Sequence, residues 1–116
     1  MHGDPVELLA GTLELLVLKA LSLEPMHGWG IGHRIGQLSN DVFIVQQGSL
    51  YPALQRMLRK GWIRSEWRVS ENNRRARYYL LTREGTRQLA AETTLWQRAS
   101  GAVNGILQFR PAPTGG

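Results

Sequence analysis

The chain has 116 residues and a net charge of +5, a length that suits one domain rather than two. It contains no cysteine, which excludes a disulfide framework and a thiolate metal site. It has neither an apolar run of about 18 residues nor the basic start of a secretory signal, so we expect a cytoplasmic protein without membrane contact. The positive charge is concentrated, because residues 56–77 hold eight Lys or Arg against two Glu. A basic patch on a small domain is typical of a protein that binds nucleic acid, although many such runs are only solvated surface.

An apolar run from Val6 to about Leu23 predicts the first helix. Its apolar side chains occupy more of the circumference than one stripe, because Leu8, Leu15 and Leu18 point away from the rest. We therefore expect cover on two sides, by the protein's own domain and, most simply, by a second subunit.

Pro25 in the turn 24–28 ends the first helix. A second helix is predicted over residues 28–38, with Ile31, Ile35 and Leu38 buried at helical spacing. Its three early glycines indicate either a close approach by backbone or phosphate, or a frayed helix start. Residues 42–45 then read as a short irregular link.

The segment 48–61 predicts a third helix with an apolar underside and a polar, cationic outer face. Ser49 is the expected N-cap, Pro52 lies in the first turn, and Gly61 ends the helix. The predicted underside consists of Leu50, Leu54, Met57 and Leu58.

Residues 62–69 and 76–82 alternate apolar and polar, and the segment 70–75 between them is rich in turn-forming residues. This predicts a β-hairpin directly after the third helix. A reading helix followed by a β-wing is the order of a winged helix-turn-helix, so the fold class is mainly α with a β-hairpin (α+β).

The last helix is predicted to begin after Thr82 as N-cap and to continue to about Phe109. Leu89, Trp96 and Val103 repeat every seven residues along it, which favours a dimer seam shared with the first helix. The expected organisation is a winged-helix DNA-binding domain over residues 6–82, a dimerisation helix over 83–109 and a disordered tail over 110–116.

Five blocks of sequence resemble the PadR family of transcriptional regulators. They are GTLELL at 11–16, PMHG at 25–28, GSLYPAL at 48–54, KGWI at 60–63 and RARYYLLTREG at 75–85. The resemblance spans roughly residues 6–107 and looks like the short type with a single C-terminal helix. The hairpin is similar to that of a branch often encoded beside transporter permeases.

The resemblance implies a homodimeric winged-helix repressor that binds double-stranded DNA at a near-palindromic operator. It implies dimers joined through the first and last helices, and no cofactor. In some members a planar, hydrophobic or phenolic compound occupies a cavity at the dimer interface, so a small aromatic effector is a further expected partner.

The expected DNA contacts lie at the start of the third helix and on the wing. Gln bonds adenine and Arg bonds guanine through paired hydrogen bonds, and Arg also suits phosphates and the minor groove. Tyr51 and Pro52 either contact DNA or only shape the helix start, and Arg77 either contacts DNA or pairs with Glu66. The candidates on the helix are Gln47, Ser49, Tyr51, Pro52, Gln55 and Arg56. Those on the wing are Asn72, Asn73, Arg74, Arg75 and Arg77.

The expected interface residues are Leu8, Leu15, Leu89, Trp96 and Val103. Trp96 either stacks on a planar effector or only packs the seam. His27 is interpreted as a structural residue of the turn before the second helix, and the three histidines lack metal-ligand spacing. No serine has an evident His/Asp partner and no carboxylates are paired, so we expect no enzyme. The alternative function is a winged-helix module that contacts protein or RNA without a specific operator.

Overall fold

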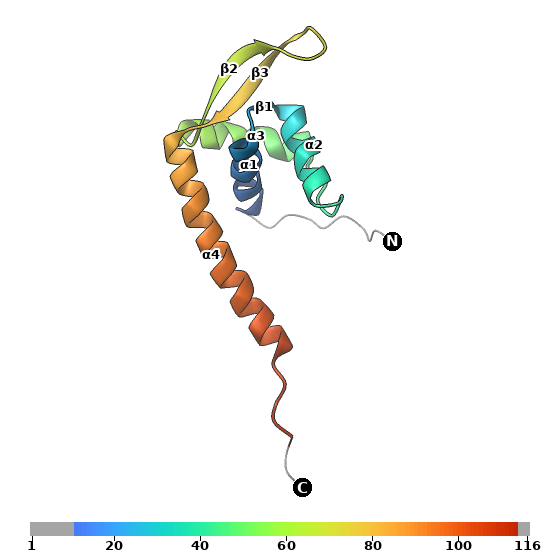
Figure 1. The fold of residues 1–116 in the computed structure, drawn as a ribbon, viewed down its shortest axis with the longest axis vertical. Coiled ribbons are helices and arrows are strands. Elements are labelled where there is room, and N and C mark those ends of the chain that lie inside the picture. Colours follow the sequence, from blue (N-terminus) through green and yellow to red (C-terminus); the bar gives the residue numbers. More distant parts are fainter. Residues whose placement is uncertain (1–10, 114–116) are drawn as a thin grey trace.

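The computed structural model describes residues 11–113 of the chain. The described elements are α1 (Thr12–Leu23), β1 (Met26–His27), α2 (Gly28–Leu38), α3 (Gln47–Arg59), β2 (Ile63–Val69), β3 (Arg75–Leu81) and α4 (Arg83–Gln108). In Figure 1, α1, α2 and α3 lie beneath the β2–β3 hairpin, and α4 runs away from them. The predicted α+β winged helix with a long last helix is confirmed.

Helix α1 starts later than the sequence pattern indicates. Gly11 has φ 86° and caps the helix, which begins at Thr12. A residue in the left-handed region does not continue a right-handed helix, so the prediction of one unbroken helix from Val6 is wrong at Gly11. Residues 6–10, with Leu8 among them, lie outside the described part of the chain.

The sequence pattern missed the short strand β1. It pairs antiparallel with β3, with Met26 opposite Tyr79 and His27 opposite Tyr78, and the strand order is β1-β3-β2. Two residues are too few to show the alternation by which a strand is recognised in sequence. β1 matters to the site because it attaches the start of α2 to the wing.

Helix α2 has the predicted bounds, and Ile31 and Ile35 are buried. Leu38 is 56% exposed, so its predicted burial is wrong. It is the last residue of the helix, and the chain turns at Ser39 before any element covers it. An added Cβ at Gly28, Gly30 or Gly32 would meet its nearest atoms at 3.4–3.9 Å, which is ordinary contact, so close approach does not require these glycines.

Helix α3 begins two residues earlier than its predicted cap. Gln46 is the N-cap, without a side-chain hydrogen bond, and its carbonyl accepts from the N–H groups of Ser49 (3.0 Å) and Leu50 (2.9 Å). The predictions of Ser49 as N-cap and of Pro52 in the first turn are therefore wrong. Pro52 lies in the second turn, where it has no N–H for the carbonyl of Gly48.

The end of α3 is as predicted. Gly61 has φ 76°, its N–H donates to the Leu58 carbonyl (3.1 Å), and the Trp62 N–H donates to the Met57 carbonyl (3.1 Å). This pair of bonds is the Schellman motif, in which glycine adopts the left-handed conformation at low cost. The motif turns the chain directly from α3 into β2.

The hairpin pairs Ile63 with Leu81 at its base and Val69 with Arg75 near its tip. The expected turn lies between them, and Asn73 has φ 58°. One face of the hairpin is anchored in the core through buried Ile63 and Tyr79. Because side chains alternate along a strand, Arg75 and Arg77 share the face of Tyr79 and lie farther out.

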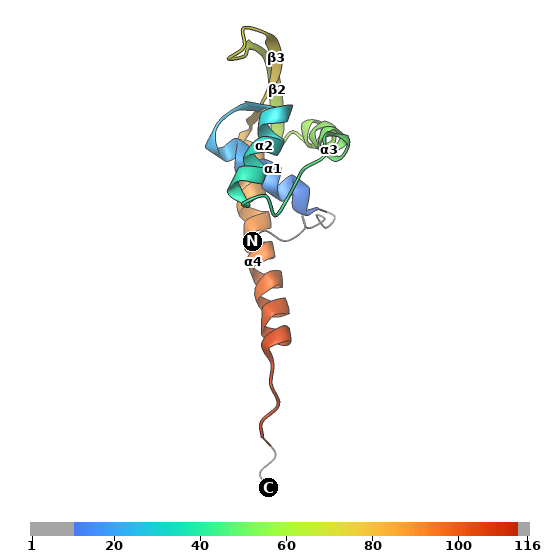
Figure 2. The same ribbon diagram turned by 90° about the vertical axis from the view of Figure 1, so that its right-hand side faces the viewer.

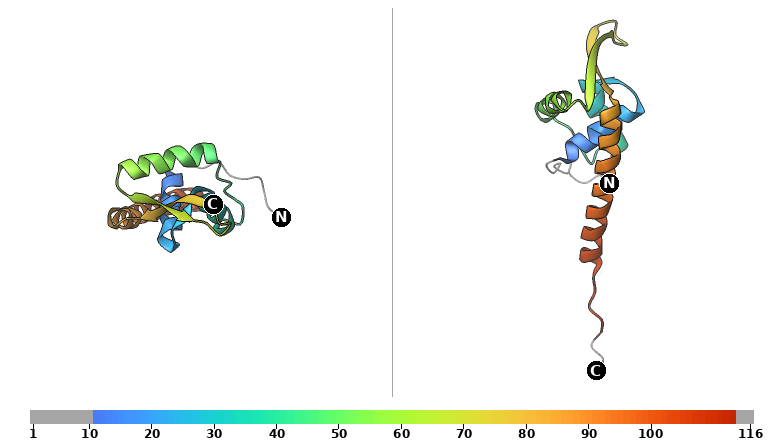
Figure 3. Two further views of the ribbon diagram at one scale, coloured as in Figure 1. Left: turned by 90° about the horizontal axis from the view of Figure 1, so that it is seen from above. Right: turned by 90° about the vertical axis from the view of Figure 1, so that its left-hand side faces the viewer.

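Thr82 joins the wing, α3 and α4. Its hydroxyl accepts from the Gly85 N–H (3.0 Å), as predicted for an N-cap, and donates to the Gly61 carbonyl (2.6 Å). Figures 2 and 3 show α4 extending well beyond the rest of the domain, with α3 to one side. Gly85 is the buried residue of α4, and residues 110–113 form neither helix nor strand.

Candidate nucleic-acid interface

The outer face of α3 is polar and open. Gln47, Ser49, Tyr51 and Pro52 are exposed and Gln55 is half-buried. The opposite face carries the core residues Leu50, Ala53, Leu54 and Met57. Burial of that face fixes the helix in the domain and leaves its first two turns accessible.

Tyr51 also connects α3 to the wing. Burial raises the pKa of the Tyr79 phenol, and the Tyr51 hydroxyl acts in the same direction, while Arg77 opposes the shift. Tyr51, Tyr79 and Arg77 therefore lie close together where the reading helix meets β3. Tyr51 keeps about half of its surface exposed.

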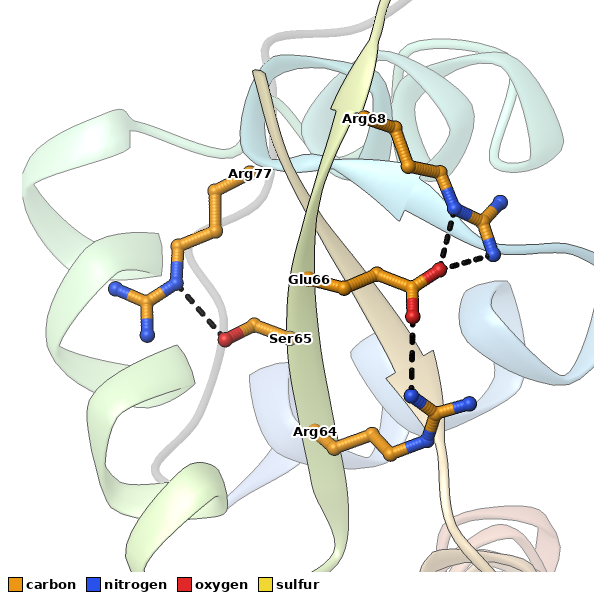
Figure 4. A network of polar contacts seen from close by, with 5 residues as sticks. All are labelled: Arg64, Ser65, Glu66, Arg68 and Arg77. Carbon is orange, nitrogen blue, oxygen red and sulfur yellow. Dashed lines mark hydrogen bonds and ion pairs between the residues drawn. The ribbon is translucent and has the colours of Figure 1, made fainter. Parts of the chain in front are cut away.

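Arg77 does not pair with Glu66. Its Nε donates to Ser65 Oγ at 2.8 Å, and Figure 4 shows this bond on one side of β2 and Glu66 on the other. In the register of the hairpin, Trp67 is opposite Arg77 and Glu66 is opposite Tyr78. The predicted pairing was wrong because Glu66 and Arg77 project from opposite faces.

Glu66 instead binds Arg64 at 3.1 Å and Arg68 through both its Nε (2.6 Å) and its Nη2. These hydrogen bonds, first that of Arg68 and then that of Arg64, lower the pKa of Glu66 below its ordinary value of 4.5. The network lies on the face away from Arg77 (Figure 4). Two of the eight cations of the basic run thus share one carboxylate, which offsets one of their two charges.

Two further cations of the run are paired at the other end of α3. Arg56 Nε lies 2.9 Å from Glu14 Oε1, and Lys60 Nζ lies 3.7 Å from Glu14 Oε2. Four of the eight cations therefore have a carboxylate partner among residues 11–113. The others are Arg59, Arg74, Arg75 and Arg77, and three of these four lie on the wing.

The wing arginines border a groove of about 980 Å³ between the hairpin and the starts of α2 and α3. The structure brings six predicted DNA contacts to this groove, namely Gln47, Tyr51, Asn72, Arg74, Arg75 and Arg77. It does not place the other five in the lining, namely Ser49, Pro52, Gln55, Arg56 and Asn73. Trp67 is exposed on the hairpin, with the Arg75 guanidinium 5.4 Å from the centre of its ring.

Sequence reasoning missed Arg34 of α2, which also lines this groove. Its Nε is buried and has no hydrogen-bond partner among the described residues. A lone Arg on a helix usually reads as a solvated side chain, so the sequence contained no signal for this position. A buried donor without an acceptor costs free energy.

His27 is structural, as interpreted from the sequence. Its Nδ1 accepts from the Gly30 N–H at 3.1 Å and caps α2, and its ring meets the Tyr78 ring edge-on at 5.4 Å. His33 stacks on exposed Trp29 at 4.7 Å. Within residues 11–113, no three His, Cys, Asp or Glu side chains gather to hold a metal ion.

The predicted interface residues differ in their surroundings. Leu89 is half-buried and packs against the core of its own domain, and Leu15 of α1 is also half-buried. The prediction that Leu18 points away from this core is wrong, because Leu18 is fully buried in it. Trp96 and Val103 are 46% and 54% exposed, with exposed Leu95, Ile106 and Leu107 on the same helix.

None of the described helices has both the length and the apolar character that crossing a membrane requires.

Solved structures of similar fold come from several bacteria. A PadR-like transcriptional regulator from Bacillus cereus is 29% identical with a TM-score of 0.76, over 86% of this chain and 95% of that one. A PadR family transcription regulator from Clostridium difficile is 27% identical with a TM-score of 0.72, over 84% and 99%. A PadR family transcriptional regulator from Eggerthella lenta is 29% identical with a TM-score of 0.72, over 86% and 85%.

A comparison with curated proteins found no match. Residues 17–91 match the family described as the transcriptional regulator PadR-like family. This segment contains the reading helix, the wing and the groove between them, and it makes up more than half of the chain. The chain therefore belongs to the PadR-like family of transcriptional regulators.

Proposed function

We propose that this transcriptional regulator is a repressor that binds a near-palindromic DNA operator as a homodimer. The observation that carries the proposal is the shared groove, which Gln47 and Tyr51 of α3 border together with Arg74, Arg75 and Arg77. DNA presents base edges flanked by rows of phosphates, so a reading surface must bring polar side chains and cations to one side. Arg34 of α2 adds a fourth arginine to the lining of the same groove.

The dimer part of the proposal rests on α4. Exposed large apolar side chains recur along its outer half, with Trp96 and Val103 seven residues apart. Such an exposed stripe is stabilised when the apolar stripe of a second subunit packs against it and removes it from water. We propose a seam formed by α4 with α1, including Leu15, Leu89, Trp96 and Val103.

A homodimer presents two copies of α3, which would enter successive major grooves about 34–36 Å apart. Its operator would therefore be a near-palindrome with that spacing between half-sites. We further propose that a planar apolar effector, stacked on Trp96 at the seam, releases the operator.

The test is selection of binding sequences from random duplexes, followed by footprinting on a recovered sequence. The proposal expects a protected inverted repeat whose halves are one helical turn apart. Uniform weak binding to any duplex or to single strands would contradict it, and would indicate a winged-helix module for RNA or protein contacts. Thermal-shift screening with planar aromatic compounds tests the effector separately, with the Trp96→Leu variant as the matched control.

A further inference from the structure

The buried carboxylate of Glu14 bridges α1 and α3. Its side chain is 12% exposed, and it binds Arg56 at 2.9 Å and Lys60 at 3.7 Å. Arg56 lies in the last turn of α3 and Lys60 is the C-cap residue, so one carboxylate holds the C-terminal end of this helix. Lys60 Nζ also lies 4.4 Å from the centre of the Trp62 ring.

Glu14 lies on the core-facing stripe of α1. It shares that face with buried Val17, Leu18 and Leu21, three, four and seven residues along the helix. An apolar residue at this place would avoid the cost of taking a carboxylate out of water. At Glu14 this cost is offset by the two cations that the carboxylate binds.

The bond to Glu14 uses one edge of the Arg56 guanidinium. Nε donates to the carboxylate, and 46% of the side chain is still exposed. The group has further N–H donors on its two terminal nitrogens. Arg56 is thus bonded to α1 through Nε while about half of its side chain stays accessible.

We infer that Glu14 is a positioning residue for DNA recognition, which restrains Arg56 so that it serves a single location on the operator. The inference rests on the proposed function. A restrained guanidinium loses less conformational freedom on binding a matching acceptor. A released one reaches any nearby phosphate, because phosphate contacts carry no sequence information. Glu14 therefore lowers the affinity for non-specific DNA and raises the preference for the operator over other sequences.

The experiment compares the full chain with its Glu14→Gln variant on the selected operator duplex and on a scrambled duplex, over a series of salt concentrations. Glu14→Gln should bind the scrambled duplex more tightly, and log K should fall more steeply with log salt, by about one unit of slope. The ratio of operator to scrambled affinity should fall about tenfold, which corresponds to one lost discriminating contact. Glu14→Asp keeps the charge and should retain the wild-type slope.

Asp41→Asn is the matched charge control. Asp41 lies in the exposed turn after α2, outside the lining of the groove, and has no ion pair among the described residues. Its replacement removes the same charge, so it should raise affinity for both duplexes by one common factor and leave their ratio unchanged. A purely electrostatic role for Glu14 would produce that same result and would overturn the inference.

A merely structural role predicts equal losses of affinity for both duplexes without a change of slope, which also overturns the inference. Arg56→Lys gives an independent test, because lysine lacks the planar fork through which a guanidinium bonds Glu14 by Nε and keeps two terminal nitrogens in a fixed direction. If Arg56→Lys keeps full operator affinity, the shared guanidinium is refuted even where Glu14→Gln does not fold. If the wild-type chain itself does not distinguish the two duplexes, the proposed function fails instead.

Discussion

Replacement of Gly85 by Ala should destabilise the fold, although alanine is the better helix former. Gly85 is buried in the first turn of α4, where an added Cβ would overlap the Trp62 carbonyl oxygen and lie 2.7 Å from Leu81 Cδ1. The carbonyl belongs to the backbone and accepts from the Thr82 N–H at 3.1 Å. It cannot retreat without weakening the junction of wing and helix.

The magnitude follows from three opposing contributions. Overpacking costs about 1–3 kcal/mol, and distortion of the Thr82 cap costs about 1 kcal/mol more. Alanine returns about 1 kcal/mol of helix propensity. We expect a net loss of about 2 kcal/mol, or a decrease in Tm of about 10 °C for a chain of this size.

Gly101 and Gly105 provide matched controls on the same helix. An added Cβ there meets no atom within 4 Å, and both positions lie on the opposite side of α4 from Val103. Gly101→Ala and Gly105→Ala should each increase stability by up to about 1 kcal/mol. Urea and thermal unfolding at one fixed protein concentration measure all three variants. A Gly85→Ala chain as stable as the controls would refute the close approach of α4 to the end of α3.

Three further outcomes are expected. Trp96→Asp should dissociate the proposed dimer, because the charge would be buried in an apolar seam, and an unchanged dimer in sedimentation would exclude Trp96 from it. Arg75→Ala should weaken binding to all duplexes alike and reduce the salt slope by about one, whereas a changed sequence preference would indicate base contact. Since Arg68 and Arg64 lower the pKa of Glu66 below 4.5 in the folded chain, its contribution to stability is present above that pH and is lost as the pH falls through the lowered value. The stability difference between wild type and Glu66→Gln should therefore shrink in acid, and a difference that grows would contradict the network.

Sequence patterns of a few neighbouring residues correctly predicted helix α2 and the end of helix α3. The bounds of α2 followed from its apolar spacing, and the end of α3 followed from Gly61, since few other residues adopt its φ. The start of α3 did not follow, because the preference of Ser49 for a cap position was weaker than the backbone bonds to Gln46. Strand β1 exists only through its pairing with β3, which no local pattern contains.

The number of cations near the site could be counted from the sequence, but which of them pair with carboxylates could not be predicted. The partner of Arg56 lies 42 residues away on α1, so no reading of neighbouring residues could identify it. The hairpin register places Glu66 and Arg77 on opposite faces of the sheet. That register depends on the length of the turn, which the sequence pattern alone did not fix. Arg34 lines the groove because α2 packs beside the wing, a tertiary contact that the local sequence does not show.

The Thr82 junction makes α4 a lever arm. Because Thr82 bonds to both Gly61 and Gly85, the end of the reading helix and the start of α4 should move together. A helix of 26 residues is about 39 Å long. A tilt of roughly 5° at the far end of such a helix displaces the near end by about 3 Å, an appreciable fraction of the advance per base pair. In a dimer joined through α4, a small change of crossing angle would put the two reading helices out of phase with the DNA repeat.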